Sequence, residues 1–193
     1  MHSICVYCGS ANQASQGYFQ IARQVGETLA QRGLGLVYGG GKTGLMGALA
    51  DGALAQGGQV IGVITEGMNT PQLAHTGLTR LEVTGTIHQR KARMYELADG
   101  YIALPGGYGT LDELFETLTW AQIGEHHKPV GLLNVNGYYD PLLEMLDRAV
   151  AEKFLFPEHR RALLCASEAG ELLDLMEAYQ PPFDAVARWM RQD

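Results

Sequence analysis

The residues best placed to do chemistry lie in one glycine-rich segment. Glycine leaves the backbone free to direct successive N–H groups toward one point. The segment follows an apolar run and opens a helical pattern, and the start of a helix adds unpaired N–H groups and the positive end of the helix dipole. These features predict a phosphate-binding turn that needs no lysine. The segment reads Pro105-Gly106-Gly107-Tyr108-Gly109-Thr110-Leu111-Asp112-Glu113.

The carboxylate of Glu113 has two interpretations. Thr110 and Glu113 have the spacing of a capping box, in which both side chains would only satisfy the start of a helix. In the other interpretation, Glu113 is catalytic. A carboxylate beside a bound phosphate would repel it, so Asp112 and Glu113 would have to face a different part of the ligand. The local sequence leaves both interpretations open.

A cation-rich helical segment supplies positive charge. Residues 86–94 carry Arg90, Lys91 and Arg93 on little more than one helical turn. Arg90, Arg93 and Met94 share one flank, at i, i+3 and i+4 spacing. A run of charges is often a solvated face, but three of the 14 cations of the chain gather here, between two expected strands. We therefore expect this segment to contact a ligand.

A second glycine turn, residues 39–44, fits the dinucleotide pattern G-x-G-x-x-G between a strand and a helix. Glu66, after the next expected strand, stands where a ribose-binding acid would fall. The turn also contains the Gly-Lys-Thr sequence of a P-loop, but Leu36 replaces the first required glycine, which excludes ATPase or GTPase chemistry. The alternative is a turn that only lets a helix and a strand pack closely.

Short apolar runs alternate with helical patterns along the chain. This alternation predicts βαβ units and a parallel sheet with helices on both faces, a doubly wound α/β fold. Ligands of such folds bind beyond the carboxyl ends of the strands, where three glycine turns fall. We expect one domain over residues 1–180 and a tail over 181–193. Strands are expected at residues 4–8, 34–38, 59–64, 81–83, 101–104 and 130–135, a loop at 66–77, and helices at 18–32, 45–56, 86–98, 110–123, 138–153, 158–165 and 169–179.

Composition excludes several classes of protein. The chain has 193 residues, of which 46% are hydrophobic and 18% charged, so it is neither disordered nor a coiled coil. A net charge of −7 lacks the basic surface of a nucleic-acid-binding protein, so we expect no nucleic-acid partner. No apolar run approaches the roughly 18 residues of a membrane-spanning helix. The apolar residues 4–8 favour a first strand over a signal peptide.

The cysteines point to no metal site. Cys5 and Cys8 form a single C-x-x-C pair, whereas a zinc site requires a second pair or nearby histidines. Residues three apart on a strand also point to opposite faces. We expect these thiols to be buried and reduced, in a cytoplasmic protein.

Together, the motifs resemble the "Lonely guy" family, the cytokinin riboside 5′-monophosphate phosphoribohydrolases. The resemblance runs from about residue 4 to residue 165. The paired R-K-x-x-M and P-G-G-x-G-T-x-x-E motifs are its most specific part. The segments that carry it are residues 8–10, 38–41, 44–47, 88–94, 105–113, 120–124 and 128–134.

The resemblance implies a Rossmann-like fold, a homodimer, and hydrolysis of AMP or isopentenyl-AMP to free base and ribose 5-phosphate, without cofactor or metal. It makes Arg90 and Glu113 the catalytic pair. Some relatives have been labelled lysine decarboxylases, but nothing in this sequence indicates a pyridoxal site. The family often has an acidic residue in the loop after the third strand, and residues 69–75 lack one, so base recognition is expected to differ. The implied substrate-site residues are Lys91, Gly106, Gly107, Tyr108, Gly109, Thr110, Leu111, Asp112 and Thr119.

Two other classes of function remain open at the level of sequence. One is a non-catalytic nucleotide-binding module or an NAD-type enzyme that uses residues 39–44. The other is a protein-interaction scaffold, which would not require two glycine turns and a basic helix at one edge of a sheet.

Overall fold

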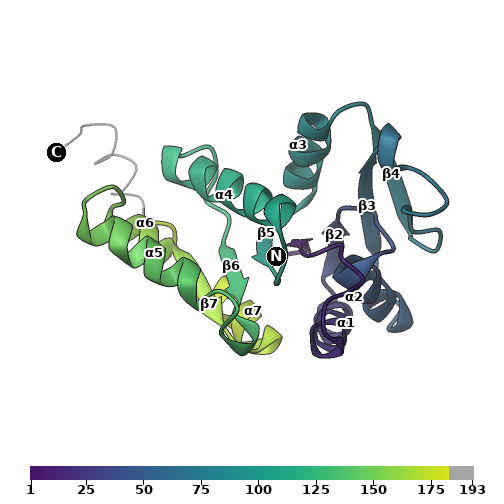
Figure 1. Ribbon diagram of the computed structural model, residues 1–193, viewed down its shortest axis with the longest axis horizontal. Helices are drawn as coiled ribbons and strands as arrows, with labels where there is room; N and C mark the ends of the chain where they lie inside the picture. Colours follow the sequence, from purple (N-terminus) through teal and green to yellow (C-terminus); the bar gives the residue numbers. More distant parts are fainter. Residues whose placement is uncertain (183–193) are drawn as a thin grey trace.

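Parallel strands form one sheet through the middle of the computed structural model, which describes residues 1–182 (Figure 1). Within these residues, the sheet has seven strands in the order β4-β3-β2-β1-β5-β6-β7. Every neighbouring pair is parallel. The strands are β1 (Ser3–Tyr7), β2 (Gly35–Tyr38), β3 (Val60–Thr65), β4 (Arg80–Thr84), β5 (Gly100–Ala103), β6 (Val130–Leu133) and β7 (Leu163–Ala166).

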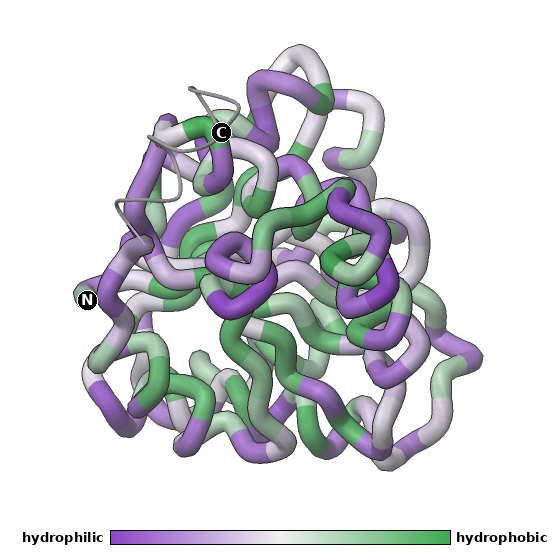
Figure 2. The backbone as a smooth tube through the Cα atoms, turned by 90° about the vertical axis from the view of Figure 1, so that its left-hand side faces the viewer, coloured by the Kyte–Doolittle hydropathy of each residue, from purple (hydrophilic) through white to green (hydrophobic). Residues whose placement is uncertain are grey.

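Helices cover both faces of this sheet, which confirms the predicted doubly wound α/β fold. Helices α1, α2 and α7 pack on one face and α3, α4 and α5 on the other. Figure 2 shows the hydrophobic segments gathered inside and the hydrophilic ones outside. Most of the expected tail, residues 183–193, lies outside the described residues. The helices are α1 (Gln16–Gln31), α2 (Gly44–Ala55), α3 (Ile87–Leu97), α4 (Tyr108–Ile123), α5 (Asp140–Ala151), α6 (Pro157–Ala162) and α7 (Ala169–Glu177), with short 3-10 helices at Glu66–Met68 and Val135–Gly137.

The central strand β1 divides its side chains between two cores. Val6 and the following Cys8 face the α1–α2 side, whereas Cys5 and Tyr7 face α3 and α4. Both thiols are buried, as predicted, and burial raises the pKa of each. Because Cys5 and Cys8 enter opposite cores, they cannot bind one metal ion together.

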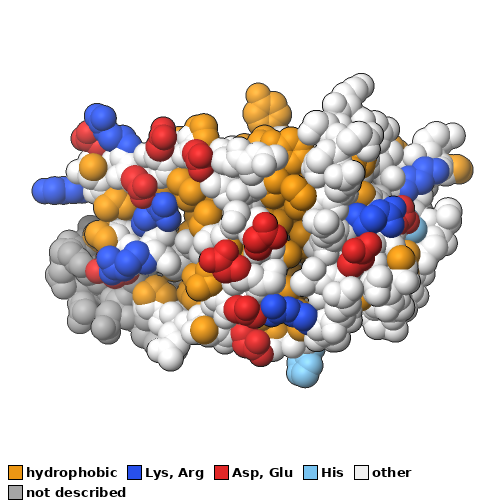
Figure 3. Space-filling view, turned by 90° about the horizontal axis from the view of Figure 1, so that it is seen from below, with side chains coloured by type: hydrophobic (Ala, Val, Ile, Leu, Met, Phe, Trp, Pro, Cys, Tyr) orange, Lys and Arg blue, Asp and Glu red, His pale blue; other side chains and the backbone are white. Residues whose placement is uncertain are grey.

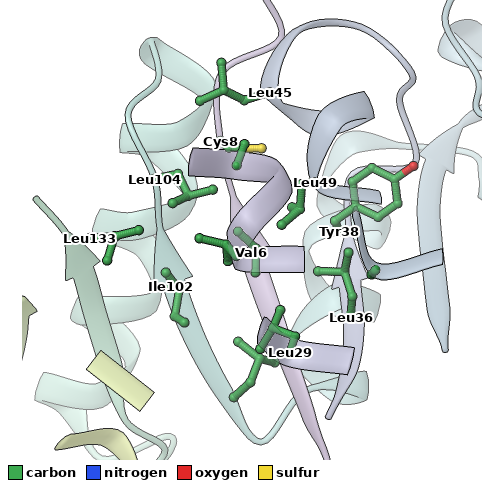
Figure 4. Close-up of a cluster of buried hydrophobic side chains, with 14 of the residues drawn as sticks. Val6, Cys8, Leu29, Leu36, Tyr38, Leu45, Leu49, Ile102, Leu104 and Leu133 are labelled. Atoms are coloured by element: carbon green, nitrogen blue, oxygen red, sulfur yellow. The ribbon is translucent and has the colours of Figure 1, made fainter. Parts of the chain in front are cut away.

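The core under α1 and α2 fixes these helices to the strands (Figure 4). Val6 of β1 and Ile102 of β5 face Leu29 of α1 and Leu49 of α2, and each is at most 1% exposed. Burying one such side chain contributes about 1.5–3 kcal/mol. The strands that end in glycine turns are therefore held rigidly.

The segment before α7 corrects the prediction. A helix was expected over residues 158–165, but α6 ends at Ala162 and β7 follows as a seventh strand. Leu163 pairs with Val130 and Ala166 with Leu133 of β6. An apolar run as short as this one fits either periodicity, and the open edge of β6 decides between them. The helix expected at residue 138 also begins later, at Asp140.

The chain order brings three glycine turns together. It builds β1 to β4 toward one edge of the sheet and then returns to place β5 on the other side of β1. Such a reversal opens a crevice at the carboxyl ends of the strands. Gly9 after β1 donates its N–H to Pro105 O after β5, at 3.0 Å. Leu45 N, which follows the glycine turn after β2, donates to Gly9 O at 2.9 Å, so the turns after β1, β2 and β5 meet at this reversal.

The distribution of charged side chains on the surface is consistent with the net charge of −7. On the face seen in Figure 3, acidic and basic side chains are interspersed rather than arranged as a basic stripe. Among the described residues, no helix has both the length and the apolar character to cross a bilayer.

Glycine should be required where α1 crosses α2. A Cβ on Gly26 would overlap Leu49 O, so Gly26→Ala is expected to destabilise the fold by about 1–3 kcal/mol. Gly17 of the same helix has open space around it, so Gly17→Ala should be neutral or stabilising. Urea unfolding of both variants measures the difference. Equal stability of the two variants would contradict the close approach.

Candidate functional site

A buried ion pair joins α3 to α4. Arg90 Nη1 donates to Glu113 Oε1 at 2.9 Å, and the two side chains are only 11% and 12% exposed. The sequence had placed these residues 23 positions apart in separate motifs. The fold brings them together, beside the meeting point of the glycine turns.

The guanidinium of Arg90 is fixed from two further sides. Its Nε donates to the backbone oxygen of Val63 in β3 at 2.9 Å. Its Nη2 lies against Gly39 after β2, where a Cβ would overlap it. Gly39 is therefore required because the arginine occupies the space of a side chain.

The helix that carries Arg90 begins with a capping box. Thr86 accepts from Gln89 N at 3.2 Å, and Gln89 Oε1 accepts from Thr86 N at 3.1 Å. The spacing T-x-x-Q is visible in the sequence and could have located the start of α3. The box anchors the first turn, one residue before Arg90.

Of the two interpretations of Glu113, the structure excludes the capping box with Thr110. Helix α4 begins at Tyr108, with Gly107 as its N-cap and no side-chain capping bond. Thr110 is buried inside the first turn, packed against Gly106. Glu113 lies in the second turn, where its carboxylate is free to pair with Arg90.

Burial sets the acidity of Glu113. Removal from water raises the pKa of the carboxyl group, and the charge of Arg90 and its hydrogen bond lower it without cancelling the rise. A carboxylate with a raised pKa is a better proton acceptor near neutral pH. The site thus holds a buried base beside a fixed cation.

A second ion-pair cluster joins the same two helices. Lys91 Nζ lies 3.0 Å from Asp112 Oδ2 and 3.0 Å from Glu116 Oε1. Burial lowers the pKa of Lys91, but the hydrogen bonds to Glu116 and Asp112 outweigh this effect and leave the pKa raised. Lys91 therefore remains charged and clamps α3 to α4.

Arg93 faces another way. Its Nε donates to Glu82 of β4 at 2.7 Å, and Nη1 donates to Glu96 at 2.9 Å. These bonds keep Arg93 at the outer edge of α3. Of the three cations, two face α4 and one does not.

The turn before α4 opens into free space. A Cβ on Gly107 or on Gly109 would meet no atom within 4 Å, and Tyr108 is 94% exposed. The N–H groups of Tyr108, Gly109 and Thr110 belong to the first turn, where helices lack internal acceptors. This geometry leaves room for an anion at the start of α4.

The turn at residues 39–44 is instead filled by protein. Besides Gly39 against Arg90, Gly44 adopts a φ of +60° against the backbone of Ser10. Lys42 N donates to Leu73 O at 2.8 Å in the loop after β3. These contacts favour the close-packing interpretation of this turn over a dinucleotide site, and Glu66 is exposed at the end of β3.

Two of the residues expected at the substrate site, Thr119 and Leu111, make other contacts within this chain. Thr119 is exposed on α4 and donates to Phe115 O at 2.7 Å. It lines a groove with Phe115 and His126, on a different face of α4 from Glu113. Leu111 packs against the core of the α3–α4 face. Within this chain, Thr119 is not brought to the ion pair.

The chain is similar to named proteins over nearly its whole length. The family model described as "Possible lysine decarboxylase" matches residues 46–176. A "Probable cytokinin riboside 5′-monophosphate phosphoribohydrolase" of Oryza sativa subsp. japonica is 49% identical, over 95% of this chain and 75% of that protein. A cytokinin riboside 5′-monophosphate phosphoribohydrolase of Arabidopsis thaliana is 46% identical, over 95% of this chain and 84% of that protein.

Solved structures with the same fold include carriers of a cofactor. The molybdenum cofactor binding protein of Rippkaea orientalis matches with a TM-score of 0.70 and 25% identity, over 92% of this chain and 96% of that one. The molybdenum cofactor carrier protein of Chlamydomonas reinhardtii matches with a TM-score of 0.69 and 22% identity, over 92% and 99%. The second likeness concerns the fold alone.

Removal of the Arg90 charge should raise the pKa of Glu113 further, because the arginine stabilises the ionised carboxylate. We expect this for Arg90→Gln in a ¹³C-glutamate NMR titration, with Glu113→Gln identifying the signal. Arg93→Gln is the control, since Arg93 pairs with Glu82 and Glu96. An unchanged Glu113 titration in Arg90→Gln would contradict the coupling.

Gly39→Ala should displace the guanidinium of Arg90 and destabilise the protein by about 1–3 kcal/mol. The displaced cation should also leave the pKa of Glu113 higher, in the same NMR titration. Gly109→Ala places a methyl group in open space, and its thermal midpoint should not fall. If both variants unfold alike, the packing of Gly39 against Arg90 is not a constraint.

Proposed function

The chain belongs to the cytokinin riboside 5′-monophosphate phosphoribohydrolase family, and on this premise we propose that it hydrolyses the N-glycosidic bond of nucleoside 5′-monophosphates. The products are a free base and ribose 5-phosphate. One observation carries the proposal: a buried arginine–carboxylate pair lies beside an open glycine turn at the carboxyl edge of the sheet. The description of the family model mentions a decarboxylase, whereas the curated relatives are named for the hydrolysis.

Glu113 performs the central chemical role. Breaking an N-glycosidic bond builds positive charge on the ribose ring, and a nearby carboxylate stabilises it. The same carboxylate accepts a proton from the attacking water, a role that its raised pKa favours, and the departing base takes up a proton from solvent. Arg90 keeps the carboxylate ionised and aimed, through bonds that also fix the arginine to Val63.

The phosphate is held apart from this chemistry. The N–H groups of Gly107, Gly109 and Thr110 and the positive end of α4 bind it in the open turn. This contact lies remote from the bond that breaks, so its binding energy positions the ribose over Glu113. A nucleoside without phosphate is therefore a poor substrate. Lys91 neutralises Asp112 and limits its repulsion of the phosphate.

The loop over residues 67–79, after β3, offers no carboxylate to the base of the substrate, so other groups recognise the base. Residues 67–79 contain no Asp or Glu, and the loop packs on the turn after β2 through Leu73 and through a bridge between Ala74 and Gly41. We propose that AMP and isopentenyl-AMP are both accepted.

The working enzyme is a homodimer in the cytoplasm. Apolar side chains remain exposed on α4, on α5 and just after α5, namely Phe115, Met145 and Phe154 at 38%, 66% and 86%. Exposed apolar patches of this kind support a second copy as partner. The three cysteines of the chain form no disulfide, which is consistent with a reducing compartment such as the cytoplasm.

The function is tested by incubation with AMP, isopentenyl-AMP, adenosine and NAD, followed by chromatography for free base. Base release from the two monophosphates, with little from adenosine or NAD, is expected. A nucleotide that binds tightly without turnover would instead indicate a carrier.

Glu113→Gln should keep the fold but lower kcat for AMP by a factor of about 100 or more, because a general base contributes roughly that much. Release of ribose 5-phosphate measures the loss, and circular dichroism checks the fold. Glu116→Gln, one turn along α4, removes a carboxylate that pairs with Lys91 and should retain most activity. Near-normal turnover by Glu113→Gln would leave Glu113 only the role of holding Arg90.

A further inference from the structure

Three consecutive carbonyl groups before α4 each accept a hydrogen bond. Leu104 O accepts from Tyr139 Oη at 2.6 Å. Pro105 O accepts from Gly9 N at 3.0 Å. Gly106 O accepts from Tyr138 Oη at 2.6 Å. The two tyrosines follow the 3-10 helix after β6, so a separate segment of the chain sets the direction of the first and third of these carbonyls.

The direction of a carbonyl fixes the N–H that follows it. In a planar trans peptide, the C=O of one residue and the N–H of the next point in opposite directions. The bond from Tyr138 to Gly106 O therefore turns the Gly107 N–H away from Tyr138. Tyr139 orients no such donor, because the residue after Leu104 is a proline without an N–H.

Local backbone preferences do not fix the orientation of the peptide between Gly106 and Gly107. Rotating the peptide between Gly106 and Gly107 by half a turn would bring the φ of Gly107 from −98° into the positive region, which only glycine enters freely. A Cβ on Gly107 would meet no atom within 4 Å, so the turn is open on the side of Gly107. The hydrogen bond from the Tyr138 hydroxyl to Gly106 O therefore restrains this peptide in its observed orientation.

Neighbouring residues hold Tyr138 in position. Its ring makes edge-on contacts with Tyr18 at 6.1 Å and with Tyr139 at 5.1 Å between ring centroids. Its backbone N–H donates to Val135 O at 3.0 Å. The side chain is nevertheless 43% exposed, so it stands at the rim of the open turn rather than in the core.

We propose that Tyr138 is a positioning residue for the substrate phosphate: its hydroxyl holds the Gly106–Gly107 peptide with the Gly107 N–H directed at the phosphate. This inference rests on the proposed function, which places the phosphate at this turn. Tyr139, its neighbour in sequence, stabilises the end of β5 and has no such role.

The test compares Tyr138→Phe with Tyr139→Phe, each of which removes one hydroxyl and keeps the ring. Tyr138→Phe should bind ribose 5-phosphate about three- to tenfold more weakly, as expected for one lost hydrogen bond. The KM for AMP should rise by a similar factor with little change in kcat, because the contact is present before and during the reaction. Tyr139→Phe should lower the thermal midpoint and leave the affinity unchanged.

A double variant separates positioning from general stability. Gly107→Ala makes a positive φ unfavourable and so resists the peptide rotation without the tyrosine. In the Gly107→Ala background, Tyr138→Phe should therefore weaken ribose 5-phosphate binding by less than about twofold, a smaller factor than in the natural sequence. Equal factors in both backgrounds would overturn the mechanism.

Calorimetric titration with ribose 5-phosphate needs no turnover, so it separates the two proposals. If the chain binds ribose 5-phosphate but does not hydrolyse AMP, the proposed function is contradicted, and the effect of Tyr138→Phe on affinity still tests the positioning role. Unchanged affinity in Tyr138→Phe, or equal weakening in both tyrosine variants, would overturn the positioning role. Failure of the natural chain to bind ribose 5-phosphate would overturn it as well.

Discussion

The buried ion pair between Arg90 and Glu113 is the interaction on which the site depends. Two charges removed from water are stable only with good geometry and with their remaining hydrogen bonds satisfied. The fold meets this demand with the Val63 carbonyl, the space left by Gly39 and the capped start of α3. The pair therefore ties the chemistry to β2, β3, α3 and α4 at once. Burial raises the pKa of Glu113, as its proposed role as a proton acceptor requires.

The glycine turns after β2 and after β5 serve opposite purposes. After β2, the glycines admit protein atoms, among them the guanidinium of Arg90 and the backbone of Ser10. After β5, Gly107 and Gly109 leave space empty of protein, and the segment is restrained through its carbonyls by Gly9 and Tyr138. One turn thus builds the cation of the site, and the other remains available to a ligand. An acidic chain can offer an anion site in this way, because backbone N–H groups act locally whatever the net charge of −7.

Much of the architecture follows from local pattern. Alternating apolar runs and helical stripes predicted the parallel sheet, and strands that end in glycines predicted where a ligand would bind. The wrong prediction and the question left open share one cause, which is that local spacing admits two structures. Leu163–Ala166 fits a helix or a strand, and the edge of β6 made it a strand. Thr110 and Glu113 fit a capping box, and the earlier start of α4 at Tyr108 excluded it.

The sequence by itself determined the fold class, the position of the glycine turns and the segments that carry Arg90 and Glu113, because periodicity and backbone freedom are local properties. Only the tertiary structure decided that the two side chains form a pair, that Arg93 turns to Glu82, and that Thr119 faces away from them. It also decided that Tyr138 restrains the turn before α4. These are contacts between residues distant in the chain, and strand order and helix packing set them rather than the residues near each one.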